Sequence, residues 1–421
     1  MSGAGARRVD VAADPAFAWA RPGAPGARAL AALNAVEPDA ARFVGGCVRD
    51  ALRGLTPGDV DVATRLEPPV VAAALDAAGL KSAPTGLAHG TLTAIVDGQG
   101  VEVTTLRADV ATDGRRAVVA FTRDWATDAA RRDFRLNAIY LGADGVLHDS
   151  VDGLADVRAG RVRFIGDPVA RIREDYLRIL RFFRFSARFA DAFDEPGLAA
   201  CAAERAGIAR LSAERVGDEF TKTLALARAA VAVRAMDVAG VLGAVWPEAP
   251  DIDAFARLKD AAPDAPAALG LAVLYAASWR DARRDGAGRT LAEALRLSNA
   301  DAARAHDAAE AAATLDPLAD ERAVKERLYR LGAPAFADAL TVRAAQDPDA
   351  HRWSAHTALA AAWSPPDFPL KGADVVARGV APGPAVTRTL NAAEDAWIEA
   401  DYPPRDVALS ILDTLCASAS T

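Results

Sequence analysis

The pattern of hydrophobic and polar residues changes near residue 165. Before that point, short hydrophobic stretches such as 92–96 and 101–106 are separated by turn-forming residues, and the turn at 97–100 between these two predicts a β-hairpin. One helix is predicted among the strands, over 68–78. After residue 165, hydrophobic residues recur every three or four positions, as on one face of a helix. The pattern therefore predicts an N-terminal α+β domain followed by an all-α region.

The helical region is predicted to contain separate amphipathic helices, and the first, over 169–190, is the richest in candidate functional groups. The clearest linker is Ser364–Pro369, because its prolines interrupt helical spacing. The helices are predicted over 169–190, 211–238, 265–277, 290–297, 300–313, 319–331, 335–345 and 386–400. The chain is accordingly predicted to have four parts, residues 1–165, 166–250, 251–365 and 366–421.

Composition is typical of a globular protein with more than one domain, since 52% of the 421 residues are hydrophobic and 25% are charged. A net charge of -8 argues against general coating of nucleic acid, but arginines outnumber acids over 158–188, which predicts a local basic patch. Three widely spaced cysteines without a C-x-x-C motif favour a reducing cytoplasm and argue against a zinc site. With no run of transmembrane length and no signal-peptide pattern, we expect a cytoplasmic protein that does not bind membranes.

Two glycines and two aspartates form the most informative stretch of the chain. Gly45 and Gly46 follow an apolar segment and precede a predicted helix, where a bare backbone can approach a phosphate. Asp59 and Asp61 lie two positions apart in a predicted strand, so their carboxylates face the same side. Two carboxylates on one edge suit Mg²⁺. Taken separately, the glycines fit a plain turn and the aspartates fit a solvated strand edge.

Taken together, G-G-x-V-R-D at 45–50 and D-x-D-x-A-T at 59–64 resemble the motif of the polymerase-beta-like nucleotidyltransferases. The form of the motif is similar to that of class II CCA-adding enzymes and bacterial poly(A) polymerases. The resemblance covers about residues 42–225 and, less closely, 365–405. It implies a head domain with a small mixed sheet, then an elongated all-α region made of a nucleobase-reading neck, a body and a C-terminal tail. The residues implied to hold a nucleoside triphosphate here are Gly45, Gly46 and Arg49.

Glu102 lies in the second strand of the predicted hairpin, on the same face as Thr104. By pattern alone it is an ordinary exposed strand residue. Strand pairing could instead place it beside Asp59 and Asp61, and three carboxylates around two Mg²⁺ ions suit in-line phosphoryl transfer. The segments H-G-T at 89–91 and E-V-T-T-L-R resemble the family segment that supplies a third carboxylate. The catalytic residues implied are Asp59, Asp61 and Glu102, and the first two are the metal ligands.

Residues 128–138 mix charged side chains with a phenylalanine before an apolar strand. Alone, this pattern fits a solvated helix start with local salt bridges. The run R-R-D-F-R-L-N-A resembles the family motif R-R-D-F-T-x-N-A, with Arg135 where the family usually has a small hydroxyl residue. Arginines neutralise phosphates, while Asp and Asn can hydrogen-bond to ribose hydroxyls. The residues implied to surround the ribose and triphosphate are Arg131, Arg132, Asp133 and Asn137.

The helix over 169–190 is predicted to present four charged side chains on one face, those of Arg171, Asp175, Arg178 and Arg181. Alone, this pattern fits an amphipathic helix with salt bridges. The core E-D-x-x-R resembles the family motif whose Asp and Arg read the nucleobase, which implies that Asp175 and Arg178 do so here. An acceptor beside a donor complements the amino group and ring nitrogen of cytosine and adenine. Guanine and uracil present these groups in the reverse order, so that acceptor would face acceptor and donor would face donor. The S-x-E-R-x-x-x-E-x-x-K segment at 212–222 is expected to support this helix.

The resemblance implies template-independent addition of C, C and A to tRNA 3′ ends, with CTP and ATP as substrates and Mg²⁺ as cofactor. A poly(A) polymerase of the same fold is an alternative, although Gly58 before the first aspartate and a net acidic C-terminus favour tRNA. A partial enzyme that adds only CC or only A is a further alternative. The alternative from another class is a catalytically inactive RNA-binding module, which the intact carboxylates argue against.

Overall fold

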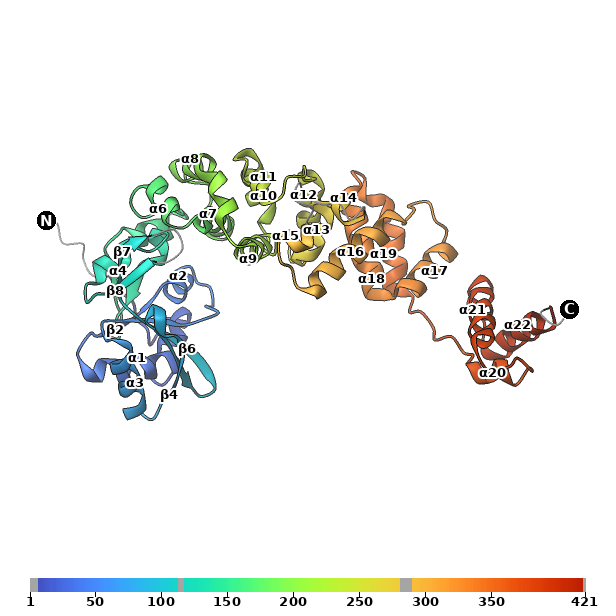
Figure 1. The fold of residues 1–421 in the computed structure, drawn as a ribbon, viewed down its shortest axis with the longest axis horizontal. Helices are drawn as coiled ribbons and strands as arrows, with labels where there is room; N and C mark the ends of the chain where they lie inside the picture. The colour runs from blue at the N-terminus through green and yellow to red at the C-terminus, as the bar shows by residue number, and fades with distance from the viewer. Residues whose placement is uncertain (1–6, 113–116, 281–289, 419–421) are drawn as a thin grey trace. The chain divides into compact units, whose positions relative to one another are not determined.

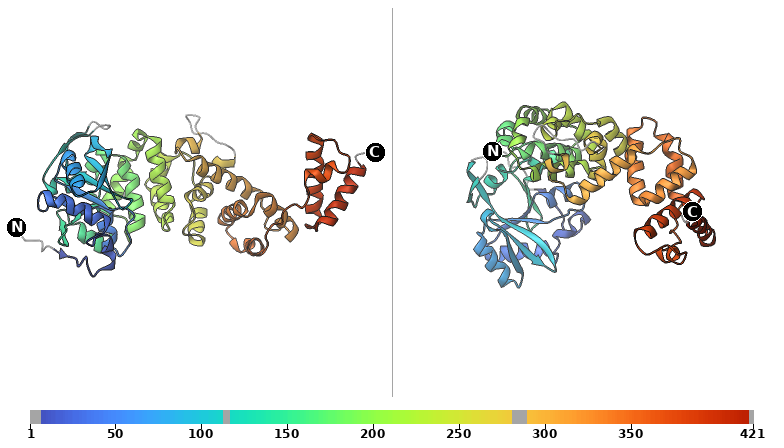
Figure 2. Two further views of the ribbon diagram at one scale, coloured as in Figure 1. Left: turned by 90° about the horizontal axis from the view of Figure 1, so that it is seen from below. Right: turned by 45° about the vertical axis from the view of Figure 1, so that its right-hand side comes forward.

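The computed structural model describes residues 7–112, 117–280 and 290–418 (Figure 1). The chain divides into two compact units, residues 1–248 with 294–296, and residues 249–293 with 297–421. In Figures 1 and 2 the strands of the described chain all lie in the blue to blue-green N-terminal part of the first unit. The predicted order, an α+β domain followed by an all-α region, is confirmed. The finer division into four parts stays a prediction.

The first unit is built around a mixed sheet with the strand order β1-β10-β9-β2-β3-β6-β5-β4. Among these described strands, β3 and β6 run parallel and the other neighbours run antiparallel. The predicted hairpin is β5 and β6, and its turn residues Asp97 and Gly98 have φ angles of 51° and 78°, as a tight hairpin turn requires. The strands of the sheet are β1 (Arg7–Arg8), β2 (Ala41–Val44), β3 (Asp61–Thr64), β4 (Lys81–Gly86), β5 (Thr91–Val96), β6 (Gln99–Thr105), β9 (Ile139–Leu141) and β10 (Val146–Asp149). A separate two-stranded ribbon consists of β7 (Arg107–Thr112) and β8 (Ala117–Phe121).

Two helices, α1 (Pro25–Val36) and α3 (Pro68–Ala77), pack on one face of the sheet. Each begins at a proline, whose fixed φ angle suits the first helical turn. Both bury leucine side chains, Leu30 and Leu33 from α1 and Leu75 from α3, which is the usual way an amphipathic helix covers a sheet. The helix predicted over 68–78 is therefore confirmed.

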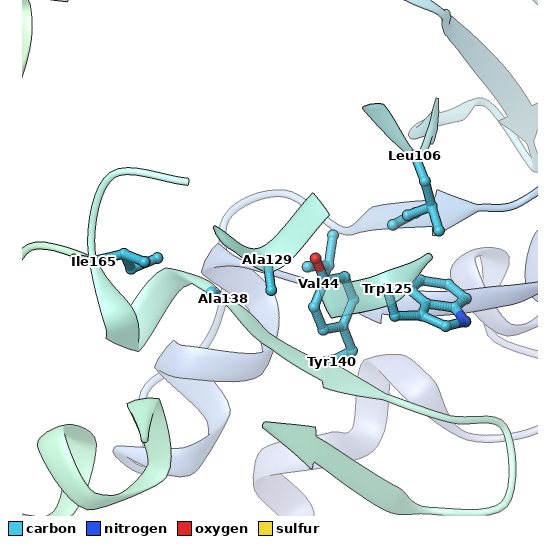
Figure 3. Packing of buried hydrophobic residues seen from close by; sticks show 8 residues of the cluster. Val44, Leu106, Trp125, Ala129, Ala138, Tyr140 and Ile165 are labelled. Atoms are coloured by element: carbon cyan, nitrogen blue, oxygen red, sulfur yellow. The ribbon is translucent and has the colours of Figure 1, made fainter. Parts of the chain in front are cut away.

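The other face of the sheet carries a second buried cluster, beside α4 (Trp125–Ala130). Ala63 of β3 belongs to this cluster, as do Trp125 and Tyr140, whose rings meet nearly edge to face with 5.2 Å between centroids (Figure 3). Because side chains alternate along a strand, Asp61 shares the face of Ala63. Strand β3 therefore presents Asp61 on the side of the sheet on which α4 lies.

Aromatic contacts join the helical part of the first unit to its α+β part. The ring of Phe134 lies 4.9 Å from that of Phe164 and 5.4 Å from that of Phe185, measured between centroids. Phe164 in turn stacks on Phe182 at 5.4 Å. The helices of this part are α5 (Gly153–Arg158), α6 (Pro168–Glu174), α7 (Leu177–Phe189), α8 (Glu195–Glu204), α9 (Ala213–Leu224), α10 (Ala229–Val238) and α11 (Val241–Val245). Helix α2 (Gly46–Leu52) lies earlier in the chain, directly after β2.

Three predicted helices are each interrupted, so the prediction of single continuous helices is wrong for them. The predicted helix over 265–277 is divided into α13 (Ala267–Leu274) and α14 (Ala276–Arg280) at Tyr275, whose φ and ψ angles are -130° and 46°. The other two breaks lie in the first unit. The predicted helix over 169–190 is divided into α6 and α7 at Asp175, whose φ and ψ angles of -155° and 106° are extended. The predicted helix over 211–238 is divided into α9 and α10 near residues 226–228. Helical spacing of hydrophobic residues continues through these two breaks, so periodicity alone could not detect them.

The regular elements of the second unit are helices, within its described residues. Helices predicted over 300–313, 319–331, 335–345 and 386–400 are confirmed as α16 (Asn299–Ala313), α17 (Glu321–Leu331), α18 (Ala333–Gln346) and α21 (Pro384–Glu399). The C-terminal helices enclose Trp397, whose ring meets Tyr329 of α17 at 5.7 Å. The remaining helices are α12 (Ile252–Ala261), α13 (Ala267–Leu274), α14 (Ala276–Arg280), α15 (Leu291–Ala294), α19 (Ser354–Ala362), α20 (Gly372–Val376) and α22 (Arg405–Ser418). None of the helices in the described ranges has the length and apolar character needed to cross a bilayer.

Candidate active site

A cavity of about 580 Å³ lies in the first unit, on the sheet face that carries Asp61. The structure brings together at this cavity all the residues predicted to bind the nucleotide and both predicted metal ligands: Gly45, Gly46, Arg49, Asp59, Asp61, Arg131, Arg132, Asp133, Asn137, Asp175 and Arg178. Arg181, Arg184 and Phe185 also line it, although sequence analysis did not assign them to the site. A larger cavity of about 950 Å³ near the N-terminal segment has mainly apolar walls and contains none of these residues.

Gly45 forms the turn between β2 and α2 with a φ angle of 76°, a conformation that favours glycine. A Cβ atom at this position would lie 3.6 Å from Nη1 of Arg132, so a side chain would occupy the edge of the cavity. Arg49, one turn into α2, is only 6% exposed; it donates to Oδ1 of Asn137 at 2.6 Å and lies over the ring of Phe189. The glycine turn and Arg49 thus form a packed wall of the cavity.

Two of the three predicted catalytic residues lie at the cavity. Asp61 is the first residue of β3 and Asp59 lies in the loop before it, so the prediction of a single strand carrying both aspartates is wrong for Asp59. Asp59 and Asp61 line the cavity, while Glu102 does not, although Glu102 is the direct register partner of Asp61 across the parallel pair β3 and β6. Burial, then the charge of Glu102, and also that of Asp59, raise the pKa of Asp61 to about 6, against the opposing effect of Arg132. Glu102 and Asp59 are therefore both close enough to Asp61 to repel its charged form. Within the described ranges, no group of three or more Asp, Glu, His or Cys side chains forms a complete metal site by itself.

Arg131 and Arg132 directly follow α4 and line the cavity, and Nη1 of Arg132 lies beside the glycine turn. Nε of Arg131 donates to Oδ1 of Asp128 at 2.8 Å, and Nη2 of Arg132 donates to Oδ2 of the same carboxylate at 3.1 Å. Both arginine side chains remain about one-fifth exposed, at 19% and 21%. Sequence analysis missed Asp128 as part of the site; its spacing of three and four residues before the two arginines is the signal that could have found it.

Asp133 and Asn137, predicted to contact the ribose, both line the cavity but already have protein partners. The Asp133 carboxylate accepts from Nη2 and Nε of Arg181, at 2.6 and 2.8 Å, and from Nδ2 of Asn137 at 3.0 Å. Burial alone would raise the pKa of Asp133, but Arg181 and Asn137 together lower it below its usual value. Asp133 therefore joins the head to α7, and a contact with ribose stays a prediction.

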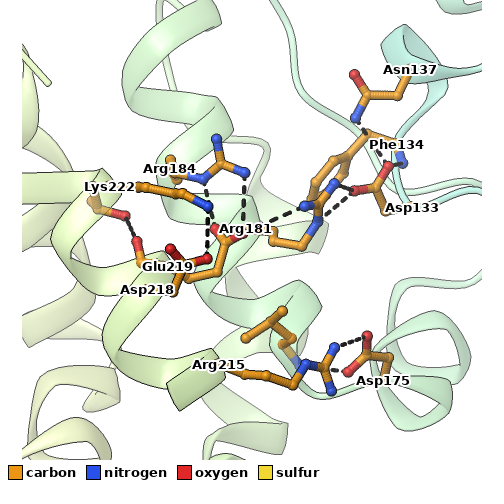
Figure 4. A network of polar contacts seen from close by, with 12 residues as sticks. Asp133, Phe134, Asn137, Asp175, Arg181, Arg184, Arg215, Asp218, Glu219 and Lys222 are labelled. Carbon is orange, nitrogen blue, oxygen red and sulfur yellow. Dashed lines mark hydrogen bonds and ion pairs between the residues drawn. The ribbon is translucent and has the colours of Figure 1, made fainter. Parts of the chain in front are cut away.

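Asp175 occupies the break between α6 and α7 rather than the middle of a helix. Its Oδ1 accepts from the backbone N–H of Leu177 at 3.1 Å, so the side chain caps the start of α7. Its Oδ2 accepts from Nη2 of Arg215 in α9 at 2.7 Å (Figure 4). The predicted single helical face is therefore wrong, yet Asp175 and Arg178 still line the same cavity.

Arg178 is held by three acceptors on neighbouring segments. Nη1 donates to Oε2 of Glu174 at 2.6 Å and to the carbonyl oxygen of Arg171 at 2.7 Å, while Nη2 donates to the carbonyl oxygen of Arg131 at 3.2 Å. A guanidinium has five N–H groups, so these bonds leave it donors for a ligand. Its position is therefore fixed on both sides, by α6 and by the arginine turn of the head.

Glu219 of α9 is a buried carboxylate that holds two arginines of α7. It is 5% exposed and accepts from Nε of Arg184 at 2.6 Å and from Nη1 of Arg181 at 3.5 Å (Figure 4). Replacing Glu219 with alanine is expected to lower the free energy of unfolding by about 3 kcal/mol, because Arg184 loses its paired carboxylate and Arg181 loses one of its two, keeping Asp133. Denaturant-induced unfolding measures this effect.

The neighbouring Asp218 provides a matched control for Glu219, since it lies in the same helix turn and pairs with Lys222 at 2.7 Å. Both partners are more than half exposed, so Asp218→Ala is expected to change the unfolding free energy by less than about 0.5 kcal/mol. Equal losses in the two variants would contradict the assigned role of Glu219.

Two family models match the first unit. Residues 41–163 match the model described as the poly A polymerase head domain, and residues 192–252 match the model described as the probable RNA and SrmB-binding site of polymerase A. The mixed sheet and the cavity lie within or beside the segment that is similar to this head domain, and the helices that follow include the segment similar to the RNA-binding model. The resemblance to the class II CCA-adding enzymes and bacterial poly(A) polymerases is thereby confirmed.

The chain is also similar to individual proteins that are named as CCA-adding enzymes. The chain is 45% identical over 203 residues to the mitochondrial CCA tRNA nucleotidyltransferase 1 of Mus musculus, with 47% of each chain covered. It is 37% identical over 186 residues to the CCA-adding enzyme of Limosilactobacillus fermentum, covering 44% of this chain and 46% of that one. The chain thus spans about half the length of the curated relatives it matches. The crystal structure of the Bacillus stearothermophilus CCA-adding enzyme in complex with CTP is similar with a TM-score of 0.73 and 26% identity, covering 95% of this chain and 99% of that chain.

Proposed function

We propose that this protein adds C, C and A to the 3′ ends of tRNA from CTP and ATP, without a nucleic-acid template and with release of pyrophosphate. The observation that carries the proposal is the convergence of three kinds of group at one cavity: two aspartates at the start of β3, several arginines, and the pair Asp175 and Arg178. The relatives named as CCA-adding enzymes support the same activity. A location in the cytoplasm stays a prediction, since one of these relatives is named as mitochondrial.

Magnesium is the cofactor that we propose for this reaction, and the donor set fits it. Asp59 and Asp61 would hold the metal, because Mg²⁺ usually binds through one or two carboxylates together with phosphates of the substrate. The raised pKa of Asp61 supports this assignment, since a cation would offset the repulsion from Glu102 and Asp59. When bound, Mg²⁺ would promote ionisation of the attacking hydroxyl and stabilise charge on the leaving pyrophosphate.

The residues of the chain would position the nucleotide rather than react with it. The attacking group is the 3′ hydroxyl of the RNA, so no protein nucleophile is required. Arg131 and Arg132 would neutralise the triphosphate from the end of α4, beside the glycine turn at Gly45. Asp133 and Asn137 would contribute polar contacts near the ribose.

Asp175 and Arg178 would select the base. Asp175 would accept a hydrogen bond from the exocyclic amino group of cytosine or adenine, and Arg178 would donate to the adjacent ring nitrogen. Arg215 orients the first of these side chains and Glu174 the second. The reading pair would therefore be assembled by the turn between α6 and α7 and by α9, not by one continuous helix.

In a direct test, the purified protein is incubated with three tRNAs, which end before the first C, before the second C and before the A. Each tRNA is combined with each of the four nucleoside triphosphates separately. We expect one or two C additions with CTP, one A addition with ATP on tRNA ending in CC, and no reaction when EDTA removes the metal. Products are sized on a denaturing gel.

The same assay distinguishes the alternatives. Long A-tails on unrelated RNA would favour a poly(A) polymerase, to which the family description of residues 41–163 also points. Addition of only CC or only A would identify a partial enzyme. If no product forms with any of the four nucleotides, the proposed activity is refuted.

A further inference from the structure

Asp128 is a buried carboxylate that touches the site only through other residues. It is 1% exposed and lies in α4, one turn before the two arginines of the cavity. Its Oδ1 accepts from Nε of Arg131 at 2.8 Å and from the backbone N–H of Arg107 at 3.1 Å. Its Oδ2 accepts from Nη2 of Arg132 at 3.1 Å and from the hydroxyl of Tyr140 at 2.7 Å. Nε of Arg132 also donates to Oδ2, at 3.3 Å. Each oxygen thus accepts from two residues, which fills the usual acceptor capacity of a carboxylate.

These four donor residues come from separate parts of the head domain. Arg131 and Arg132 leave the end of α4, Tyr140 lies in β9, and Arg107 begins β7, immediately after the strand that carries Glu102. Burial alone would raise the pKa of Asp128, yet Arg132, Arg131 and the Tyr140 hydroxyl lower it to about 2. The carboxylate is therefore ionised at neutral pH and saturated by protein donors, so it cannot itself bind metal or nucleotide.

We propose that Asp128 is a positioning residue, which fixes the guanidinium groups of Arg131 and Arg132 for contact with the triphosphate of the incoming nucleotide. This inference rests on the proposed function. A long arginine side chain loses rotamer entropy when a ligand immobilises it, and an arginine already held by a buried anion has lost much of that entropy on folding. Asp128 thereby increases affinity for nucleotide without touching it.

A second buried aspartate provides the matched control. Asp156 of α5 is fully buried and pairs with Arg163 and Arg161, yet none of these three residues lines the nucleotide cavity. Asp128→Asn and Asp156→Asn remove the same charge from similar surroundings. A role confined to folding predicts that the two variants behave alike.

The test measures KM for CTP, KM for tRNA and kcat for both variants and the wild type, together with binding of labelled CTP in equilibrium dialysis. For Asp128→Asn we expect KM and Kd for CTP to rise about tenfold or more, with KM for tRNA changed less than about twofold. For Asp156→Asn we expect both KM values to stay unchanged, since a loss of folded protein lowers only the apparent kcat. Unchanged CTP binding in Asp128→Asn would overturn the inference.

Two further outcomes are decided by the same measurements. If the wild type binds CTP but transfers no nucleotide, the proposed function fails, and the dialysis result alone supports or overturns the role of Asp128. If the wild type does not bind CTP, both proposals fail. If Asp128→Asn cannot be purified in folded form, Tyr140→Phe replaces it in the test, because this substitution removes one donor to the carboxylate and keeps the carboxylate itself. A rise of about threefold in KM for CTP would then support the inference, and an unchanged KM for CTP would overturn it.

Discussion

Replacing Asp61 with asparagine is expected to abolish nucleotide transfer while leaving the protein at least as stable as the wild type. Asp61 lies at the cavity, in register with Glu102 and two residues after Asp59. An asparagine side chain has about the same size as aspartate but no charge. The variant would lose metal-assisted stabilisation of the transition state, which is worth several kcal/mol, or about a thousandfold in kcat.

The expected gain in stability follows from the charges around Asp61. Its pKa is raised, which means that the folded protein disfavours the ionised form. The folded state therefore binds the proton more tightly than the unfolded chain does, and stability from this group is present at low pH and lost as the pH rises through about 6. At pH 8 without metal, removal of the charge should accordingly raise the unfolding temperature.

Transfer assays with Mg²⁺ and thermal unfolding in EDTA test both halves of this expectation. Asp76→Asn is a suitable control, because Asp76 is exposed on α3, away from the cavity, and should leave kcat and stability unchanged. Activity of Asp61→Asn within tenfold of the wild type would contradict the assignment of Asp61 as a metal ligand. A large loss of stability would contradict the electrostatic argument.

Local sequence is sufficient to predict the elements on which the site is built. The β5–β6 hairpin follows from alternating residues on either side of Asp97 and Gly98, and the conformation at Gly45 follows from a glycine between a strand and a helix. The parallel pairing that sets Glu102 beside Asp61 is different, because it joins strands far apart in the chain. Periodicity contains no information about such a pairing, and only the family resemblance predicted it.

The break at Asp175 shows what periodicity cannot reveal. A short acidic side chain can accept a hydrogen bond from the backbone two residues later, and it then competes with helix formation without altering hydrophobic spacing. Here the competition is decided by Arg215 of α9, which binds the other oxygen of Asp175. The spacing of Asp128 before Arg131 and Arg132 does indicate its ion pairs, but its contact with Tyr140 forms only in the folded sheet.

Replacing Arg178 with alanine is expected to weaken discrimination of CTP and ATP from UTP and GTP by about a hundredfold, with some transfer retained. A binding site whose polar groups match one hydrogen-bonding pattern rejects the opposite pattern because buried donors and acceptors would be left unpaired. Without Arg178, only Asp175 would remain to read the base. Glu174, which is 29% exposed, would lose one of its two arginine partners but keep Arg171.

Arg173→Ala is the matched control for Arg178→Ala. Arg173 lies in the adjacent helix α6 and pairs with Glu204 at 2.8 Å, but its side chain is 64% exposed and does not line the cavity. The measurement is kcat/KM for each of the four nucleotides on tRNA that lacks its terminal A and on tRNA that lacks CCA. We expect the ratio of ATP to GTP, and of CTP to UTP, to fall only in Arg178→Ala. An unchanged ratio in that variant would show that Arg178 does not select the base, and Arg215, which pairs with Asp175 at 2.7 Å, would be the next residue to replace.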